Sequence, residues 1–244
     1  MSRWHGLAWW AAALPALPIA LLLAVRTHRQ ALRLAPAAGP VSGRAGMGLE
    51  GDPLRLLVLG ESTVAGVGAS CLEYALAGRL AAELAERYRR PVHWLACGEN
   101  GITAHEACER LLPRVLEEPV DLALLVFGVN DTTHLSPASQ WRSALETMAT
   151  SLAKRGARVA FSSVPPLQHF FALPWLLRRL LGARARLLDA QLREVAQASG
   201  TVYCPMTLEF VRGYLAVDGY HPSSLGYRMW AQGLAQLLSP VRVD

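Results

Sequence analysis

Residues 54–63 read LRLLVLGEST, and this stretch decides the fold. Its first six residues are apolar except for Arg55, and the run stops at Gly60. A short apolar run that ends at a glycine is typical of a strand buried on both faces of a parallel sheet. Glu61 and Ser62 follow at once, so two polar side chains stand at the carboxyl end of the predicted strand.

The rest of the chain alternates between strand and helix patterns. We predict strands at 54–59, 92–96, 122–127, 158–162 and 202–204, and helices at about 74–89, 104–117, 139–155, 183–198 and 224–238. Such alternation favours a parallel sheet with helices on both faces. Because ligands of these sheets bind beyond the carboxyl ends of the strands, functional side chains are expected directly after the strands.

Four polar clusters occupy the expected positions. Three of them follow predicted strands and the fourth precedes the last helix: GEST at 60–63, GENG at 98–101, GVND at 128–131 and DGYHP at 218–222. Each cluster alone is common in turns and helix caps. The ordered set at one edge of a sheet favours a shared active site instead.

These clusters contain the groups that ester hydrolysis requires. Ser62 offers a nucleophilic hydroxyl at a strand-to-helix turn, and His221 can take its proton and return it to the leaving group. Asp218, three residues before the histidine, can orient the imidazole. The backbone N–H of Gly101 and the side-chain amide of Asn130 can stabilise the oxyanion.

The set resembles the SGNH, or GDSL-like, serine hydrolases from about residue 54 to residue 238, most specifically in the DGYHP block. The resemblance implies Ser62 as the nucleophile, His221 as the base and Asp218 as its partner, and it adds the N–H of Ser62 to the oxyanion hole of Gly101 and Asn130. It implies a three-layer α/β/α sandwich, flavodoxin-like, with a five-stranded parallel sheet and with no metal or organic cofactor. Glu61 stands where the family usually has aspartate, and we expect activity to survive this change.

The predicted function is therefore carboxylic ester hydrolysis through an acyl-enzyme, on a small-molecule or lipid ester. Acyl transfer or deacetylation of a glycan uses the same residues and stays an alternative. A catalytically silent binding protein on the same fold is a third hypothesis, for which Glu61 is the only indication. Glycoside cleavage by Glu61 and Glu99 as paired carboxylates explains the site less well than the serine set does.

The N-terminal segment is apolar, with no charge in the 20 residues from Gly6 to Val25. This length matches the hydrocarbon core of a bilayer, so we predict a transmembrane anchor at 1–25, a linker at 26–53 and the hydrolase domain at 54–244. A cleaved signal peptide is the alternative, although its apolar region is normally shorter. We expect the protein at a bacterial inner membrane. The arginines after the span favour a cytoplasmic enzyme domain, whereas membrane-linked relatives are often exported, so both sides stay open.

Charge and cysteine spacing give no reason to propose nucleic-acid binding or a zinc site. The net charge of +5 comes from five arginines in residues 1–44, which leave 19 basic and 19 acidic residues in 45–244. The balanced domain gives no reason to propose nucleic-acid binding. The four cysteines lack the spacing of zinc ligands. Residues 169–177, HFFALPWLL, are unusually apolar for a loop and predict either core packing or a lid over the site.

Overall fold

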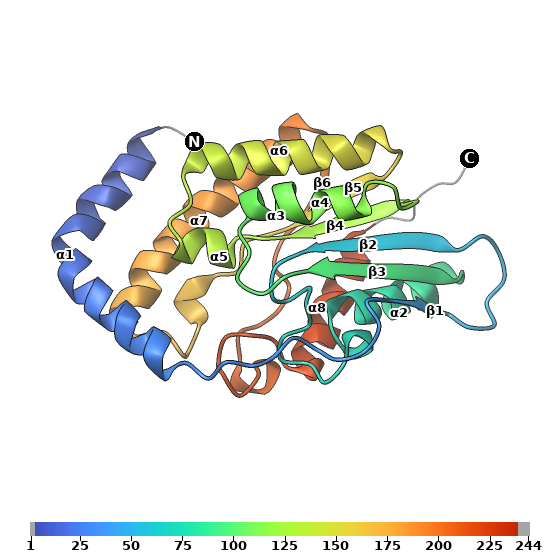
Figure 1. Ribbon diagram of the computed structural model, residues 1–244, viewed down its shortest axis with the longest axis horizontal. Coiled ribbons are helices and arrows are strands. Elements are labelled where there is room, and N and C mark those ends of the chain that lie inside the picture. The colour runs from blue at the N-terminus through green and yellow to red at the C-terminus, as the bar shows by residue number, and fades with distance from the viewer. Residues whose placement is uncertain (1–2, 239–244) are drawn as a thin grey trace.

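The computed structural model describes residues 3–238. Six strands form one sheet in the order β1-β3-β2-β4-β5-β6, with helices on both faces (Figure 1). The bounds of the strands are β1 Ser42–Ala45, β2 Leu54–Gly60, β3 Val92–Gly98, β4 Leu122–Val126, β5 Arg158–Ser162 and β6 Val202–Cys204. The principal helices are α1 Arg3–Gln30, α2 Leu76–Tyr88, α3 Ala104–Arg110, α4 Leu112–Val115, α5 Val129–Thr133, α6 Ala138–Lys154, α7 Trp175–Ala198 and α8 Ser224–Leu237.

The buried strand residues divide between two hydrophobic cores because successive side chains point to opposite faces. Leu57 and Leu59 of β2 pack with α3, α6 and α7 on one face. Leu56 and Val58 pack with α2 and α8 on the other. The three-layer arrangement therefore follows from strands that are apolar on both faces, as the sequence predicts.

The sheet is mixed rather than wholly parallel, so the predicted five-stranded parallel sheet is wrong. The five predicted strands are parallel to their neighbours, but β1 adds a sixth, antiparallel strand beside β3. β1 reads SGRA and lies inside the segment 26–53. No apolar run marks these four residues, and only pairing with a distant strand defines them as a strand.

The predicted N-terminal transmembrane helix is also wrong. Across residues 3–238, no helix combines the length and the hydropathy that crossing a bilayer requires. One side of α1 packs against the protein, since Trp9, Ala13 and Ala20 are buried. Trp9 Nε1 donates a hydrogen bond of 2.9 Å to the carbonyl of Leu180 in α7. The apolar residues on the buried side of α1 therefore serve packing between helices.

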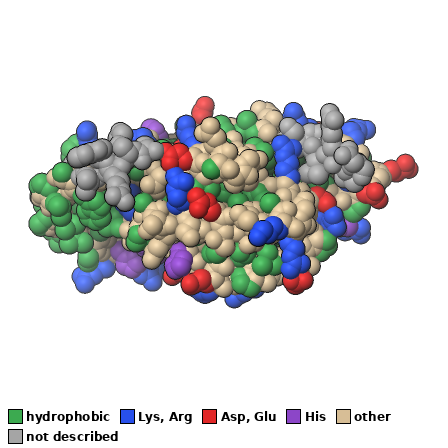
Figure 2. All heavy atoms as spheres, turned by 90° about the horizontal axis from the view of Figure 1, so that it is seen from above, with side chains coloured by type: hydrophobic (Ala, Val, Ile, Leu, Met, Phe, Trp, Pro, Cys, Tyr) green, Lys and Arg blue, Asp and Glu red, His purple; other side chains and the backbone are tan. Residues whose placement is uncertain are grey.

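The outer side of α1 remains apolar. Leu14, Ile19 and Leu22 are each more than half exposed, and Figure 2 shows hydrophobic side chains gathered at the end of the molecule where α1 lies.

Two helices differ from their predicted extents. The helix expected at 104–117 is divided into α3 and α4, because Pro113 at the start of α4 cannot donate a backbone hydrogen bond. α7 begins at Trp175, eight residues before the predicted helix at 183–198. Within the apolar stretch 169–177, Phe170, Leu173 and Leu177 are buried, whereas Phe171 and Trp175 are exposed. This stretch thus contributes to the core and also leaves two large apolar side chains at the surface.

Candidate active site

The carboxyl ends of β2, β3 and β4 meet at one edge of the sheet. Gly60 at the end of β2 is in register with Gly98 of β3 and with Val126 of β4. The chain segments that leave these three strands therefore start side by side. This register brings the predicted clusters at 60–63, 98–101 and 128–131 to the same edge.

Ser62, His221 and Asp218 form a continuous hydrogen-bonded chain. His221 Nε2 lies 3.0 Å from Ser62 Oγ, and His221 Nδ1 lies 2.7 Å from Asp218 Oδ2. The side chain of Asp218 is 2% exposed, while that of His221 is 22% exposed. The partly exposed histidine thus lies between a buried carboxylate and the hydroxyl of the buried Ser62.

Asp218 is fixed by its own loop. Its Oδ1 accepts hydrogen bonds from the backbone N–H groups of Tyr220 and His221, at 3.0 and 3.1 Å. Burial tends to raise the pKa of Asp218, but the hydrogen bonds from His221 and from the Tyr220 amide outweigh it, so the pKa lies below its ordinary value. The carboxylate therefore stays ionised and holds the imidazole in one orientation.

The loop that carries His221 is tied to the nucleophile loop through α8. The amide of Ala216 donates to the carbonyl of His221 at 2.7 Å. Ser223 caps α8 by accepting a hydrogen bond from the amide of Gly226. On the same helix the fully buried Tyr227 donates its hydroxyl to the carbonyl of Val67 at 2.7 Å. These contacts fix the histidine loop relative to the segment that follows Ser62.

Glu61 joins the nucleophile turn to the start of α5. The residue is 2% exposed, and its two carboxyl oxygens accept hydrogen bonds from the amides of Val129 and Asn130, at 3.0 and 2.9 Å. Burial is the largest influence and raises the pKa of Glu61 to about 8, although these two hydrogen bonds lower it. The residue before Ser62 therefore positions the backbone of Asn130.

Asn130 is linked in turn to the segment that carries Gly101. Asn130 Nδ2 donates to the carbonyl of Ile102 at 3.0 Å. The amide group has two N–H donors, so the second remains for a ligand. Gly101 is exposed and has φ of +87°, a conformation that favours glycine. Thr103 then caps α3 in a capping box with Glu106, which fixes the end of this segment.

The turn into α5 depends on Gly128. This residue has φ of +124°, and a Cβ there would lie 2.6 Å from a methyl group of Val164. Only glycine fits this turn without moving Val164, which follows β5. The close approach places Asn130 at the end of β4, two residues after the turn.

The other charged candidates lie apart from the hydrogen-bonded chain. Glu99 forms an ion pair with Arg110 at 2.6 Å, and His105 faces Glu109 on the surface of α3 at 3.6 Å. His134 is exposed at the end of α5. Glu61 is occupied by backbone amides, so Glu61 and Glu99 are not arranged as a pair of carboxylates on one substrate.

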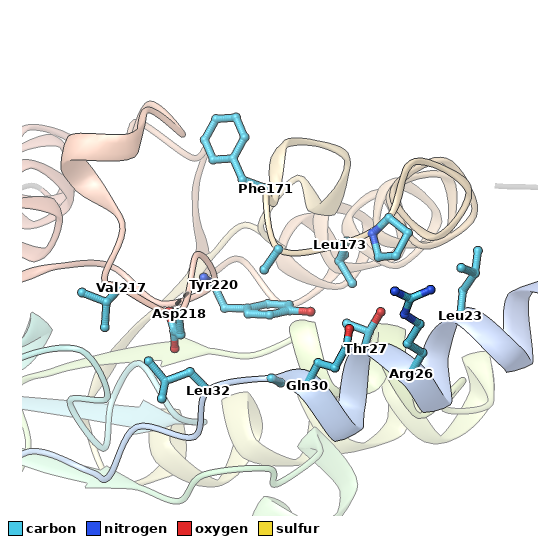
Figure 3. Close-up of a pocket in the computed structure, with 13 residues that line it drawn as sticks. Leu23, Arg26, Thr27, Gln30, Leu32, Phe171, Leu173, Val217, Asp218 and Tyr220 are labelled. Atoms are coloured by element: carbon cyan, nitrogen blue, oxygen red, sulfur yellow. Dashed lines mark hydrogen bonds between the residues drawn. The ribbon is translucent and has the colours of Figure 1, made fainter.

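A pocket of about 580 Å³ opens beside the histidine loop. One wall is the C-terminal part of α1, and the other consists of residues 171–174 and the loop around Asp218. Figure 3 shows the ring of Tyr220 between Asp218 and the α1 residues Thr27 and Gln30. The sequence gives no signal for this wall, because some 190 residues separate α1 from the loop that it faces.

Comparison with known proteins agrees with this geometry. Residues 58–229 match the model of the GDSL-like Lipase/Acylhydrolase family. A GDSL-like esterase from Mycobacterium tuberculosis is 28% identical over 186 residues, which cover 73% of this chain and 59% of the relative. The chain thus spans well under two thirds of the length of that curated relative.

Two solved structures share the fold. TesA has a TM-score of 0.61 and 22% identity, with coverage of 77% of this chain and 99% of TesA. The lipase/acylhydrolase from Enterococcus faecalis has a TM-score of 0.61 and 21% identity, with coverage of 75% of this chain and 94% of that protein. The family match covers most of the chain, including the three strand ends and the histidine loop. The chain therefore belongs to the GDSL-like lipase/acylhydrolase family, and the resemblance to SGNH hydrolases is confirmed.

Proposed function

We propose that the protein is a carboxylic ester hydrolase that works through an acyl-enzyme on Ser62. The observation that supports this function best is the chain from Ser62 Oγ through His221 to Asp218, with contacts of 3.0 and 2.7 Å. A serine is a weak nucleophile until an adjacent base takes its proton. Here the base is within hydrogen-bond distance and is itself oriented by a buried carboxylate.

In the first half-reaction, Ser62 Oγ attacks the ester carbonyl carbon while His221 Nε2 takes the hydroxyl proton. The bond to the alcohol oxygen then breaks, and His221 gives that oxygen its proton. In the second half-reaction, water attacks the acyl-serine, with His221 again as base. The products are the free acid and the alcohol, and Ser62 recovers its proton.

The oxyanion formed in both half-reactions needs donors that are already in place. We assign this role to the backbone N–H groups of Ser62 and Gly101 and to the side chain of Asn130. Each such donor is worth about 10²- to 10³-fold in rate. The hydrogen bonds of Glu61 and of Asn130 Nδ2 described above support the assignment, since they fix the segment that carries the amide.

Hydrolysis of p-nitrophenyl acetate, butyrate and palmitate by the full chain tests this function. We expect turnover in the wild type and a loss of at least about 10³-fold in Ser62→Ala. Ser70→Ala is the matched control, since Ser70 is an exposed serine near the end of the same loop, and it should keep wild-type turnover. The series of chain lengths also separates esterase from lipase activity.

A fluorophosphonate probe gives a second readout on the same proteins. We expect covalent labelling of the wild type and of Ser70→Ala, but not of Ser62→Ala. Turnover that survives Ser62→Ala would refute the acyl-enzyme. A folded wild type that neither turns over these esters nor reacts with the probe would favour the silent binding protein.

A further inference from the structure

The pocket beside the histidine loop contains part of α1. Leu23, Arg26, Thr27 and Gln30 line it, and their spacing of three, four and seven residues places them on one face of the helix. α1 is held there by the packing of Trp9 and Ala20 on the enzyme domain. This wall lies outside residues 58–229, the segment that matches the family. The wall that α1 contributes therefore lies outside the part of the chain that matches the family model.

The position of the pocket indicates which part of an ester it receives. Val217, Asp218 and Tyr220 line it, and the same loop carries His221, which gives its proton to the leaving alcohol in the proposed reaction. The oxyanion donors Gly101 and Asn130 come from other strand ends and do not line it. Ser62 and His221 are not among its lining residues either, so the pocket borders the histidine loop beside the reacting groups. Since the proton donor must lie beside the leaving oxygen, the alcohol part of the substrate points toward this pocket.

In the part of the chain that the structure describes, the pocket is lined by one cationic and one acidic side chain, which are not paired with each other. Of the described residues that line it, Arg26 is the only cation and Asp218 the only acid. The Asp218 side chain is 2% exposed and is hydrogen-bonded to His221, so its charge is directed at the histidine. Among the ion pairs within residues 3–238, none involves Arg26. Figure 3 shows its guanidinium directed from α1 toward the loop of Leu173.

From this arrangement, and resting on the proposed function, we infer that the substrate is an ester whose alcohol part carries an anionic group, and that Arg26 binds this group. A guanidinium is suited to planar carboxylates and to phosphates. Thr27 and Gln30 add a hydroxyl and an amide on the same face, and Leu23 and Leu173 supply apolar surface. The anionic group takes no part in breaking or forming bonds. Water adds to the acyl carbon, and the alcohol is released with the anionic group still attached.

The test compares matched esters that differ only in charge on the alcohol side. The probes are 3-(butyryloxy)benzoate and 3-(butyryloxy)benzamide, and the quantity measured is the ratio of their kcat/KM values in the full-length protein. In Arg26→Ala we expect this ratio to fall about fivefold, as for one solvent-exposed ion pair. Arg26→Lys should keep most of the ratio, and Arg26→Glu should lower it further.

Two controls separate this inference from general effects of charge. Arg29→Ala removes an exposed arginine of the same helix that does not line the pocket, and it should lower the ratio much less than Arg26→Ala does. The acyl-side pair, 4-nitrophenyl hemisuccinate and 4-nitrophenyl butyrate, should respond little to Arg26→Ala. The pair 1-butyrylglycerol 3-phosphate and 1-butyrylglycerol repeats the comparison with phosphate in place of carboxylate. An unchanged alcohol-side ratio in Arg26→Ala, or a loss confined to the acyl-side pair, would overturn the inference.

A binding measurement keeps this result distinct from failure of the proposed function. 3-Hydroxybenzoate, the product alcohol, can be titrated into Ser62→Ala and followed by NMR, with 3-hydroxybenzamide as the neutral comparison. We expect the carboxylate to bind more tightly, and the preference to disappear when Arg26→Glu is added. Equal binding of both ligands would overturn the inference even if the enzyme is active, whereas absence of turnover alone would bear only on the acyl-enzyme.

Discussion

At the scale of single residues, Glu61 connects the nucleophile turn with the oxyanion segment. Its side chain spans the distance to two amides of α5, and aspartate is shorter by about 1.5 Å, the length of one C–C bond. In Glu61→Asp we therefore expect kcat for p-nitrophenyl butyrate to fall about tenfold, a fraction of what one oxyanion donor contributes. Glu99→Asp, which shortens a half-buried glutamate at the same edge of the sheet, is the control. Equal kcat values in wild type and Glu61→Asp would contradict a positioning role.

The buried Glu61 also makes stability depend on pH. Burial raises its pKa to about 8 in the folded protein, whereas a glutamate in an unfolded chain titrates near pH 4.3. The folded state binds this proton more tightly, so the resulting stabilisation is complete below the unfolded pKa and is lost as the pH rises toward the folded pKa.

Relative to Glu61→Gln, the free energy of unfolding of the wild type should thus fall by about 1 kcal/mol per pH unit between about pH 5 and pH 8. Urea denaturation of both proteins across this range measures the difference. Two parallel pH profiles would mean that Glu61 titrates alike in the folded and unfolded states.

Asp218 provides a second prediction at this scale. Asparagine keeps the size of the side chain but offers the imidazole no negative charge, so the histidine loses both its orientation and the stabilisation of its protonated form. We expect kcat in Asp218→Asn to fall about 10⁴-fold, with little change in the thermal melting of the protein. Asp52→Asn, at an exposed position, controls for loss of charge. A loss below about tenfold in Asp218→Asn would remove Asp218 from the catalytic set.

At the scale of elements, α1 is held to α7 chiefly through Trp9. Its indole donates to Leu180 and lies under the guanidinium of Arg184, 5.1 Å from the ring centroid. Trp9→Ala should weaken this packing by about 3 kcal/mol and so increase local opening of α1. Limited trypsin digestion followed by mass spectrometry should show faster cleavage after Arg26 and Arg29. Trp10→Ala, at the more exposed neighbouring tryptophan, is the control, and equal cleavage rates would contradict the docking of α1.

The elements that the sequence predicted well are those whose local pattern and tertiary role coincide. The parallel strands are short, apolar runs that are buried on both faces, and their ends carry Ser62 and Asn130 as expected. The hydropathy pattern led to the wrong prediction of a transmembrane helix at α1, because hydropathy measures how apolar a segment is and not whether lipid or another helix covers it. It failed at β1, because SGRA becomes a strand only by pairing with β3.

The site likewise combines features that the local sequence pattern predicts with features that only tertiary packing determines. The closeness of Ser62, His221 and Asp218 was predictable because chemistry restricts which residue types can act together and the sheet determines where they lie. The hydrogen bonds of Glu61 to α5 and the contribution of Arg26 to the pocket were not predictable. They depend on how separate elements pack, and residue spacing along the chain contains no record of that packing.

At the scale of the whole molecule, the excess of positive charge comes from the N-terminal segment, part of which borders the pocket. Residues 1–44 contain five arginines and no acidic residue, and α1 brings three of the arginines, at 26, 29 and 33, to the end that borders the pocket or directly after it. Such a field attracts anions over about 10 Å at 0.1 M salt and over longer distances at lower salt. For 3-(butyryloxy)benzoate, kcat/KM should fall several-fold between about 20 and 500 mM NaCl, whereas the neutral amide should change little. Equal salt dependence of the two esters would contradict electrostatic attraction of the substrate.

The position of β1 at the edge of the sheet affects the self-association of the protein. A seven-residue strand such as β3 would otherwise present unpaired backbone groups to neighbouring chains and invite aggregation through shared sheets. The four residues of β1 pair with β3 at this edge of the sheet. The opposite edge strand is β6, which is only three residues long. β1, whose sequence shows the weakest strand pattern, therefore protects the protein against self-association at high concentration.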